Sequence, residues 1–142
     1  MTTPLPLKRA DLLQQGLFIG NSFASPEGQN RFDVRNPASG ALLAQVVSAT
    51  RADAQAAIEA ADKALPSWRR TTGRERSRML RKWFDLIVKN ADDLATLMTL
   101  EQGKPLAEAK GEVLYGASFI EWFAEEAKRV EGSLLASPQR DK

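Results

Sequence analysis

The residues of this sequence best placed to do chemistry are two pairs of glutamates. In each pair the acids stand four residues apart, a spacing that puts both carboxylates on one face of a helix, where two acids could act together. We interpret them instead as exposed helix faces paired with Lys104, Lys110 or Lys128, because glutamates are usually exposed. The pairs are Glu108 with Glu112 and Glu121 with Glu125.

Three further charged residues also have ordinary structural interpretations. As a Schiff-base amine Lys104 would have to be buried, and a lysine in a Gly-Lys-Pro turn is usually exposed. Asp92 and Asp93 could be imagined as magnesium ligands, but they follow Asn90 at the start of a predicted helix, where the helix dipole favours acids. We therefore predict no metal site and no catalytic residue in this chain.

The composition excludes several kinds of active site. The 142 residues contain neither cysteine nor histidine, so there is no thiol nucleophile, imidazole base, disulfide or zinc site of the usual kind. Neither of the two glycine-rich phosphate-binding motifs, G-x-G-x-x-G and G-x-x-x-x-G-K-S/T, follows a predicted strand. The net charge of +2 is too small to demand a polyanionic partner. Because we find no secretory signal and no apolar run of about 18 residues, we predict a cytoplasmic protein.

The secondary-structure elements that position these residues begin, in chain order, with short strands. We expect a short helix at 9–15, followed by strands at 17–23, 31–35 and 42–47. The segments between the strands are rich in residues that favour turns. The pattern predicts a small antiparallel meander or a pair of hairpins, whose edges must be covered by something larger.

Two helices follow the strands. Thr50 and Asp53 form a capping pair at the start of an alanine-rich helix, which we expect to end at Leu65, before Pro66. The helix predicted at 74–90 is strongly amphipathic, with an apolar face and a basic face.

A joint between two further helices is the most distinctive local feature. The third helix starts near Asn90, with Asp93 as its capping partner, and stops at Gly103, which can adopt a left-handed conformation. The fourth helix occupies residues 105–131 and is apolar over a wide surface. Its two glycines, at positions 111 and 116, cost helix stability, which suggests close approach by another element.

Five segments of the chain occur in an order and at a spacing that match a known family. They are Asn-Pro-Ala-Ser-Gly at 36–40, Ala-Thr-Arg-Ala-Asp at 49–53, Trp-Arg at 68–69, the joint at 100–113 and the run at 115–125. In these segments the chain resembles the aldehyde dehydrogenase superfamily, most closely the bacterial succinate-semialdehyde dehydrogenases, from about residue 17 to residue 142. The family's Gly-Glu-Trp in the first strand is here Asn21-Ser22-Phe23.

The resemblance implies an α+β fold class, in which a small antiparallel strand meander is followed by four helices. Residues 17–142 would form the leading, truncated part of the family's cofactor-binding domain. Residues 1–16 would form an N-terminal arm that contains a short helix. Aldehyde dehydrogenases attack the aldehyde with a cysteine thiolate, pass hydride to NAD(P)⁺ and release the acid with a glutamate-activated water. This chain contains no cysteine and is expected to end before the other catalytic and cofactor-binding residues. No catalytic or cofactor-binding residue is therefore assigned, and the chain alone is predicted to be inactive.

The resemblance also implies one functional location. In whole enzymes of the family the helix that matches 105–131 borders the substrate entrance, so Gly111, Tyr115 and Phe119 are expected near it. Ordinary packing against a sheet outside this chain is the alternative. The expected partners are the remainder of the enzyme or a second copy of the chain bound through the fourth helix.

Two other functions stay open. The wide apolar surface of the fourth helix would also suit a helical protein-interaction module. A basic helix at 69–89 could instead bind nucleic acid, since only Glu75 and Asp85 oppose its bases. The bases are Arg69, Arg70, Arg74, Arg76, Arg78, Arg81, Lys82 and Lys89.

Overall fold

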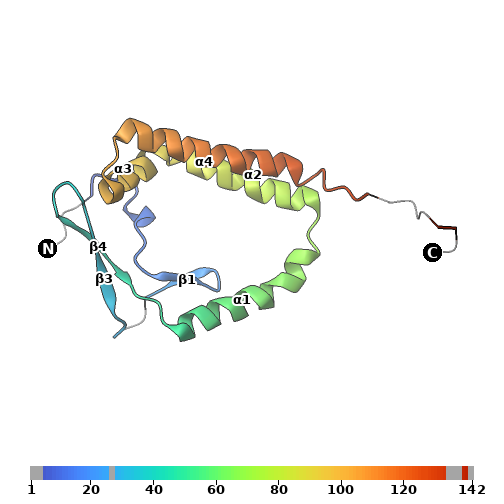
Figure 1. Cartoon of the computed structure of the whole chain (residues 1–142), viewed down its shortest axis with the longest axis horizontal. Coiled ribbons are helices and arrows are strands. Elements are labelled where there is room, and N and C mark those ends of the chain that lie inside the picture. The colour runs from blue at the N-terminus through green and yellow to red at the C-terminus, as the bar shows by residue number, and fades with distance from the viewer. Residues whose placement is uncertain (1–4, 26–27, 134–138, 141–142) are drawn as a thin grey trace.

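The computed structural model describes residues 5–25, 28–133 and 139–140, and shows two short hairpins followed by four helices (Figure 1). The elements are η1 (Ala10–Leu12), β1 (Leu17–Ile19), β2 (Ser22–Ala24), β3 (Arg31–Arg35), β4 (Leu42–Val47), α1 (Arg51–Arg69), α2 (Gly73–Lys89), α3 (Ala91–Gln102) and α4 (Leu106–Glu126). The predicted α+β class, with strands before four helices, is confirmed.

The strands form two separate antiparallel hairpins, so of the two predicted arrangements the pair of hairpins is confirmed and the continuous meander is wrong. The strand predicted at 17–23 is wrong, because Gly20 and Asn21 have positive φ angles of 59° and 68° and reverse the chain there. β3 pairs with β4, with an irregularity between Val34 and Arg35. The helix predicted at 9–15 is only the single 3-10 turn η1.

α1 begins as predicted and ends later than predicted. The Thr50 side chain accepts from the Asp53 N–H, and the Asp53 carboxylate accepts from the Thr50 N–H, which completes a capping box. Pro66 lies inside the helix instead of ending it. The last turn is held from outside, because the Trp68 carbonyl accepts from the Thr71 hydroxyl at 2.7 Å and from the Arg76 guanidinium at 3.2 Å.

The three later helices pack together around small side chains. α4 lies against both α2 and α3, and Ala91, Ala95, Ala109 and Val113 form the buried cluster between them. No large side chain is fully buried among the described residues. Because alanine occupies little volume, the helix backbones approach closely instead of being separated by bulky side chains.

The close backbone approach occurs at Gly73 and not at the glycines of α4. A Cβ atom at Gly73 would lie 2.3 Å from the carbonyl oxygen of Ala127, just beyond the end of α4. At Gly111 and Gly116 a Cβ would meet nothing within 4 Å, so the predicted close approach there is wrong for the described part of the chain. The start of α2 therefore lies directly against the end of α4, which stops at Glu126 rather than 131.

The cap predicted for α3 is also wrong. Asn90 makes no side-chain cap; its amide donates to the Leu86 carbonyl at 2.7 Å. Asp93 is buried and accepts from the backbone N–H groups of Lys8 and Arg9 at 3.1 and 2.9 Å. At the other end Gly103, with φ of 78°, stops α3 as predicted.

The chain is open rather than compact. α2 and α4 run along one side and α1 along the other, with the β3–β4 hairpin at one end and the β1–β2 hairpin beside α1 (Figure 1). The accessible surface is 11036 Å², against about 7,200 Å² for a compact protein of this mass. No residue of α1 is buried. Within residues 5–25, 28–133 and 139–140, no helix has the length and apolarity needed to cross a membrane.

A second capping box, at the start of α2, makes stability depend on pH. The Thr72 backbone N–H donates to Glu75 at 2.7 Å, and this bond and the Thr72 hydroxyl lower the pKa of Glu75 from its ordinary value of 4.5. Because the folded pKa is the lower one, the stabilisation is complete above about pH 4.5 and is lost as pH falls through the folded pKa.

We therefore expect Glu75→Gln to lower the melting temperature at pH 7 and to change it much less at pH 3. Thermal unfolding followed by circular dichroism at both pH values measures this. Glu108→Gln, on the exposed surface of α4, is the control and should show no such difference. An equal effect of Glu75→Gln at both pH values would contradict the assignment.

Candidate functional site

The three residues predicted near a substrate entrance lie on one stripe of α4. Gly111, Tyr115 and Phe119 are each four residues apart, so they follow one another on the same helix face. Tyr115 is 66% exposed and Phe119 is 48% exposed. The opposite side of the helix is the one that packs in the core. Its buried residues are Ala109, Val113, Ala117 and Ala124.

The aromatic rings on this stripe contact each other. Tyr115 and Phe119 meet edge to face, with ring centroids 4.9 Å apart and planes at 79°, an arrangement that aromatic pairs prefer. Gly111, one turn earlier, adds no side chain, and a Cβ there would meet no described atom within 4 Å. The stripe is thus an apolar ridge with a polar phenol group.

The same ridge continues into a hollow between α4 and α2. Phe119, Trp122 and Phe123 line it with apolar surface, and its volume is about 720 Å³. Trp122 is 64% exposed and Phe123 is 57% exposed. Its polar rim consists of Arg81, Ser118, Glu121 and Glu125. We call Tyr115, Phe119, Trp122 and Phe123 the aromatic ridge.

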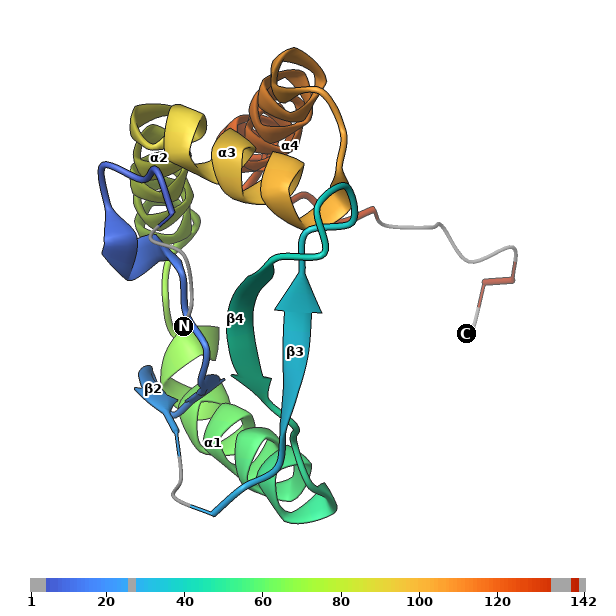
Figure 2. The ribbon, with the colours of Figure 1, turned by 90° about the vertical axis from the view of Figure 1, so that its left-hand side faces the viewer.

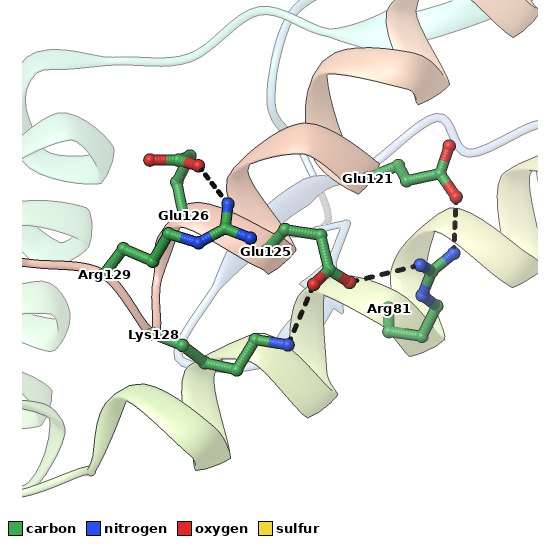
Figure 3. Close-up of polar contacts among 6 residues, drawn as sticks. All are labelled: Arg81, Glu121, Glu125, Glu126, Lys128 and Arg129. Atoms are coloured by element: carbon green, nitrogen blue, oxygen red, sulfur yellow. Dashed lines mark hydrogen bonds and ion pairs between the residues drawn. The ribbon is translucent and has the colours of Figure 1, made fainter.

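The rim of the hollow is an ion-pair cluster that joins the two helices (Figure 3). Arg81 of α2 donates to Glu121 at 2.7 Å and lies 3.4 Å from Glu125, and Lys128 donates to the other Glu125 oxygen at 2.9 Å. The Arg81 guanidinium also lies over the Phe84 ring, 5.2 Å from its centre. Glu121 and Glu125 therefore share one partner, an arginine from another helix, in addition to the predicted lysine contact.

The contacts of this cluster favour the ionised form of Glu125. The hydrogen bond from Lys128 is the main cause that lowers the pKa of Glu125 from its ordinary value, and the bond to Glu121 raises the pKa of Arg81. Glu125 thus stays ionised at neutral pH, whereas a general acid needs a raised pKa. The cluster therefore links α4 to α2 through ionised groups.

The lysine partners predicted for the glutamates are partly right. Lys128 pairs with Glu125, and Lys104 pairs with Glu112. Among the described residues Lys110 pairs with Asp92 on α3 rather than with a glutamate, its ammonium lying 2.8 Å from that carboxylate. Within the described part of the chain no three acidic, cysteine or histidine side chains gather as metal ligands would.

The basic face of α2 is partly used within the chain. Besides Arg81, Arg76 lies over the Trp68 ring at 5.2 Å and donates to the Thr71 hydroxyl at 2.9 Å. These contacts tie the end of α1 to α2. Nucleic-acid binding by the remaining bases stays a prediction.

Comparison with known proteins agrees over nearly the whole chain. The model of the family described as "Aldehyde dehydrogenase family" matches residues 23–142. The glutarate-semialdehyde dehydrogenase of Pseudomonas aeruginosa is 50% identical over 97% of this chain, and the NADP⁺ succinate-semialdehyde dehydrogenase of Escherichia coli is 49% identical over 97%. This chain spans 29% of the length of each relative.

Solved structures give the same result. The crystal structure of succinate-semialdehyde dehydrogenase from Burkholderia pseudomallei superposes with a TM-score of 0.89, at 48% identity, over 94% of this chain and 28% of that one. A betaine aldehyde dehydrogenase from Staphylococcus aureus, solved with NAD⁺, superposes with a TM-score of 0.84, at 29% identity, over 92% of this chain and 27% of that one. The fold described above is therefore a part of a larger known fold.

Proposed function

The chain belongs to the aldehyde dehydrogenase family, and we propose that it supplies the substrate-entrance side of an NAD(P)-dependent semialdehyde dehydrogenase. The observation that carries the proposal is the aromatic ridge, because it places the predicted entrance residues Tyr115 and Phe119 together on the solvent side of α4. Gly111 lies one turn before them and leaves the helix backbone open to a ligand.

The substrate class follows from the relatives and from the chemistry of the ridge. Succinate and glutarate semialdehydes carry a short methylene chain between the aldehyde and a carboxylate. Aromatic faces suit the methylenes, because burial of apolar surface is favourable. The phenol group of Tyr115 can donate a hydrogen bond to a carboxylate. We infer that the ridge guides such a substrate towards the reaction centre.

Catalysis itself needs groups that this chain does not contain. Aldehyde oxidation requires a nucleophile, a base and a hydride acceptor held together. The sequence has no cysteine and no histidine, and the acid cluster beside the ridge is fixed in ion pairs. We infer that NAD(P)⁺ and the catalytic cysteine belong to polypeptide outside this sequence, and that the chain alone is inactive.

The exposed apolar surface supports a role in association. Ile58 of α1 is 63% exposed, and Trp122 of α4 is 64% exposed. Such surface is usually covered by a partner. The remainder of a family enzyme is the partner that we propose; a second copy bound through α4 is the alternative. Sedimentation of the purified chain distinguishes a dimer from a monomer.

The test is a graft. The segment of the E. coli relative that matches this chain is replaced by this chain, and both the graft and the isolated chain are assayed with succinate and glutarate semialdehydes and NADP⁺. We expect the graft to be active and the isolated chain to stay at background. In the graft, Tyr115→Ala combined with Phe119→Ala should lower kcat/KM by about tenfold or more, the scale of one lost apolar contact.

Leu106→Ala is the matched control, since Leu106 is also an exposed apolar residue of α4 but stands away from the ridge. Its kcat/KM should stay close to that of the parent graft. Turnover by the isolated chain would overturn the proposal that the catalytic groups lie outside this sequence. A folded, active graft that tolerates loss of Tyr115 and Phe119 would overturn the entrance role.

A further inference from the structure

The N-terminal arm, residues 5–16, contacts both the helices and the hairpins, which also meet where Pro37 lies against Gly103. At one end it lies against the start of α3, and at the other it reaches β4 and β2 (Figure 2). The strongest packing between elements lies within the helices α2 to α4 and within each hairpin. The arm is therefore in a position to link the helical part to the strands.

The first half of the arm, at Lys8 and Arg9, is held by one buried carboxylate. Both oxygens of Asp93 are used: Oδ1 accepts from the Lys8 N–H at 3.1 Å and Oδ2 from the Arg9 N–H at 2.9 Å. Asp93 is only 5% exposed. Hydrogen bonds to a buried charged group are stronger than the average, and their loss leaves the carboxylate unsatisfied.

Beside Asp93, Asp92 makes a weaker kind of contact with the arm. Its carboxylate lies 3.6 Å from the Lys8 ammonium and 2.8 Å from the Lys110 ammonium, and its side chain is 61% exposed. Ion pairs this exposed contribute little. The two neighbouring aspartates thus offer a matched pair: one holds the arm's backbone, and the other touches only a side chain.

The last part of the arm, at Gln15, covers the edge of β4 that does not pair with β3. The Val47 N–H donates to the Gln15 carbonyl at 3.0 Å, and the Gln45 N–H donates to the Gln15 side chain at 3.1 Å. The next residue, Gly16, is pressed against β2, because a Cβ there would lie 2.5 Å from the Ala24 carbonyl oxygen. One short segment therefore contacts both hairpins.

We propose that the arm is a strap, latched by Asp93, that holds the β3–β4 hairpin to the helices and covers the free edge of β4. Releasing the latch frees Lys8 and Arg9 and loosens Gln15, so the amides of Gln45 and Val47 become open to water. An unpaired strand edge is also a site where other chains can add. The strap is thus a conformational link between α3 and β4, elements more than 40 residues apart in sequence.

Amide hydrogen exchange on the full chain tests the strap. In Asp93→Ala, the amides of Gln45 and Val47 should exchange at least about tenfold faster, as expected for local opening. The Ser48 amide, which donates to Asn30 beside β3, should change little. Asp92→Ala should leave all three amides near their parental rates.

Two results would overturn the proposal. One is faster exchange at Lys8 and Arg9 with unchanged rates at Gln45 and Val47, which would make the two ends of the arm independent. The other is equal acceleration at Gln45, Val47 and Ser48 in Asp93→Asn. That variant keeps one acceptor oxygen, so it should open the arm partly without loosening the whole fold.

Discussion

Replacing Gly73 by alanine is expected to lower the free energy of unfolding by about 3 kcal/mol, the upper end of the usual cost of overpacking. The added Cβ would lie 2.3 Å from the Ala127 carbonyl oxygen and 3.3 Å from its carbon. Both are backbone atoms, so no side chain can rotate away. The start of α2 and the end of α4 must move apart, which disturbs the contact between the two helices that pack most extensively.

Urea unfolding followed by circular dichroism measures this effect. Gly111→Ala is the matched control, because a Cβ at Gly111 meets no atom of the described residues within 4 Å, and alanine should stabilise the helix by up to about 1 kcal/mol. The two substitutions are chemically identical and opposite in expected sign. If Gly73→Ala also proved neutral or stabilising, the close approach of α2 to α4 would be wrong.

Gly103→Ala is expected to cost about 2 kcal/mol for two separate reasons. Gly103 has φ of 78°, a left-handed conformation that costs other residues roughly 1–2 kcal/mol. In addition, the new Cβ would lie 3.0 Å from Cγ of Pro37, in the loop between β3 and β4. The substitution therefore strains the joint between α3 and α4 and presses on the hairpin.

Gly40→Ala separates the two contributions. Its φ of 71° is similar, but within the described part of the chain a Cβ there meets nothing within 4 Å, so only the conformational cost of about 1 kcal/mol remains. Adding Pro37→Ala to Gly103→Ala should restore the part of the unfolding free energy that the contact with Pro37 costs, because residues in contact have non-additive effects. Equal unfolding energies for Gly40→Ala and Gly103→Ala would show that Pro37 yields at no cost.

The features that the sequence predicts well are decided by neighbouring residues. The capping box of Thr50 and Asp53 and the stop at Gly103 each depend on a few consecutive positions. The helical repeat likewise places Tyr115 and Phe119 on one face whatever lies beside the helix. Such local patterns carry their own physical cause, so the shared face of Tyr115 and Phe119 could be predicted before the fold was known, whereas their place near an entrance is implied only by the family resemblance.

The features that the sequence misses are decided by distant partners. Pro66 lies inside α1, and the Trp68 carbonyl beyond it accepts from Arg76, a residue of the next helix. Asp93 is no cap for α3, because backbone groups more than 80 residues earlier use its carboxylate. Arg81 is the centre of the cluster beside the ridge, and its partner Glu121 stands 40 residues away. No spacing rule along one helix reveals such pairs.

The open arrangement of α1 and the alanine-lined core also determine how sharply the chain unfolds. A fully unfolded chain of this mass exposes about 22,600 Å², so folding to 11036 Å² buries only about half of it, against roughly two thirds in a typical domain of this size. Heat capacity change and denaturant sensitivity both scale with the area exposed on unfolding. The chain should therefore have a shallow stability curve and a broad urea transition, both of which would sharpen when a partner covers its apolar faces.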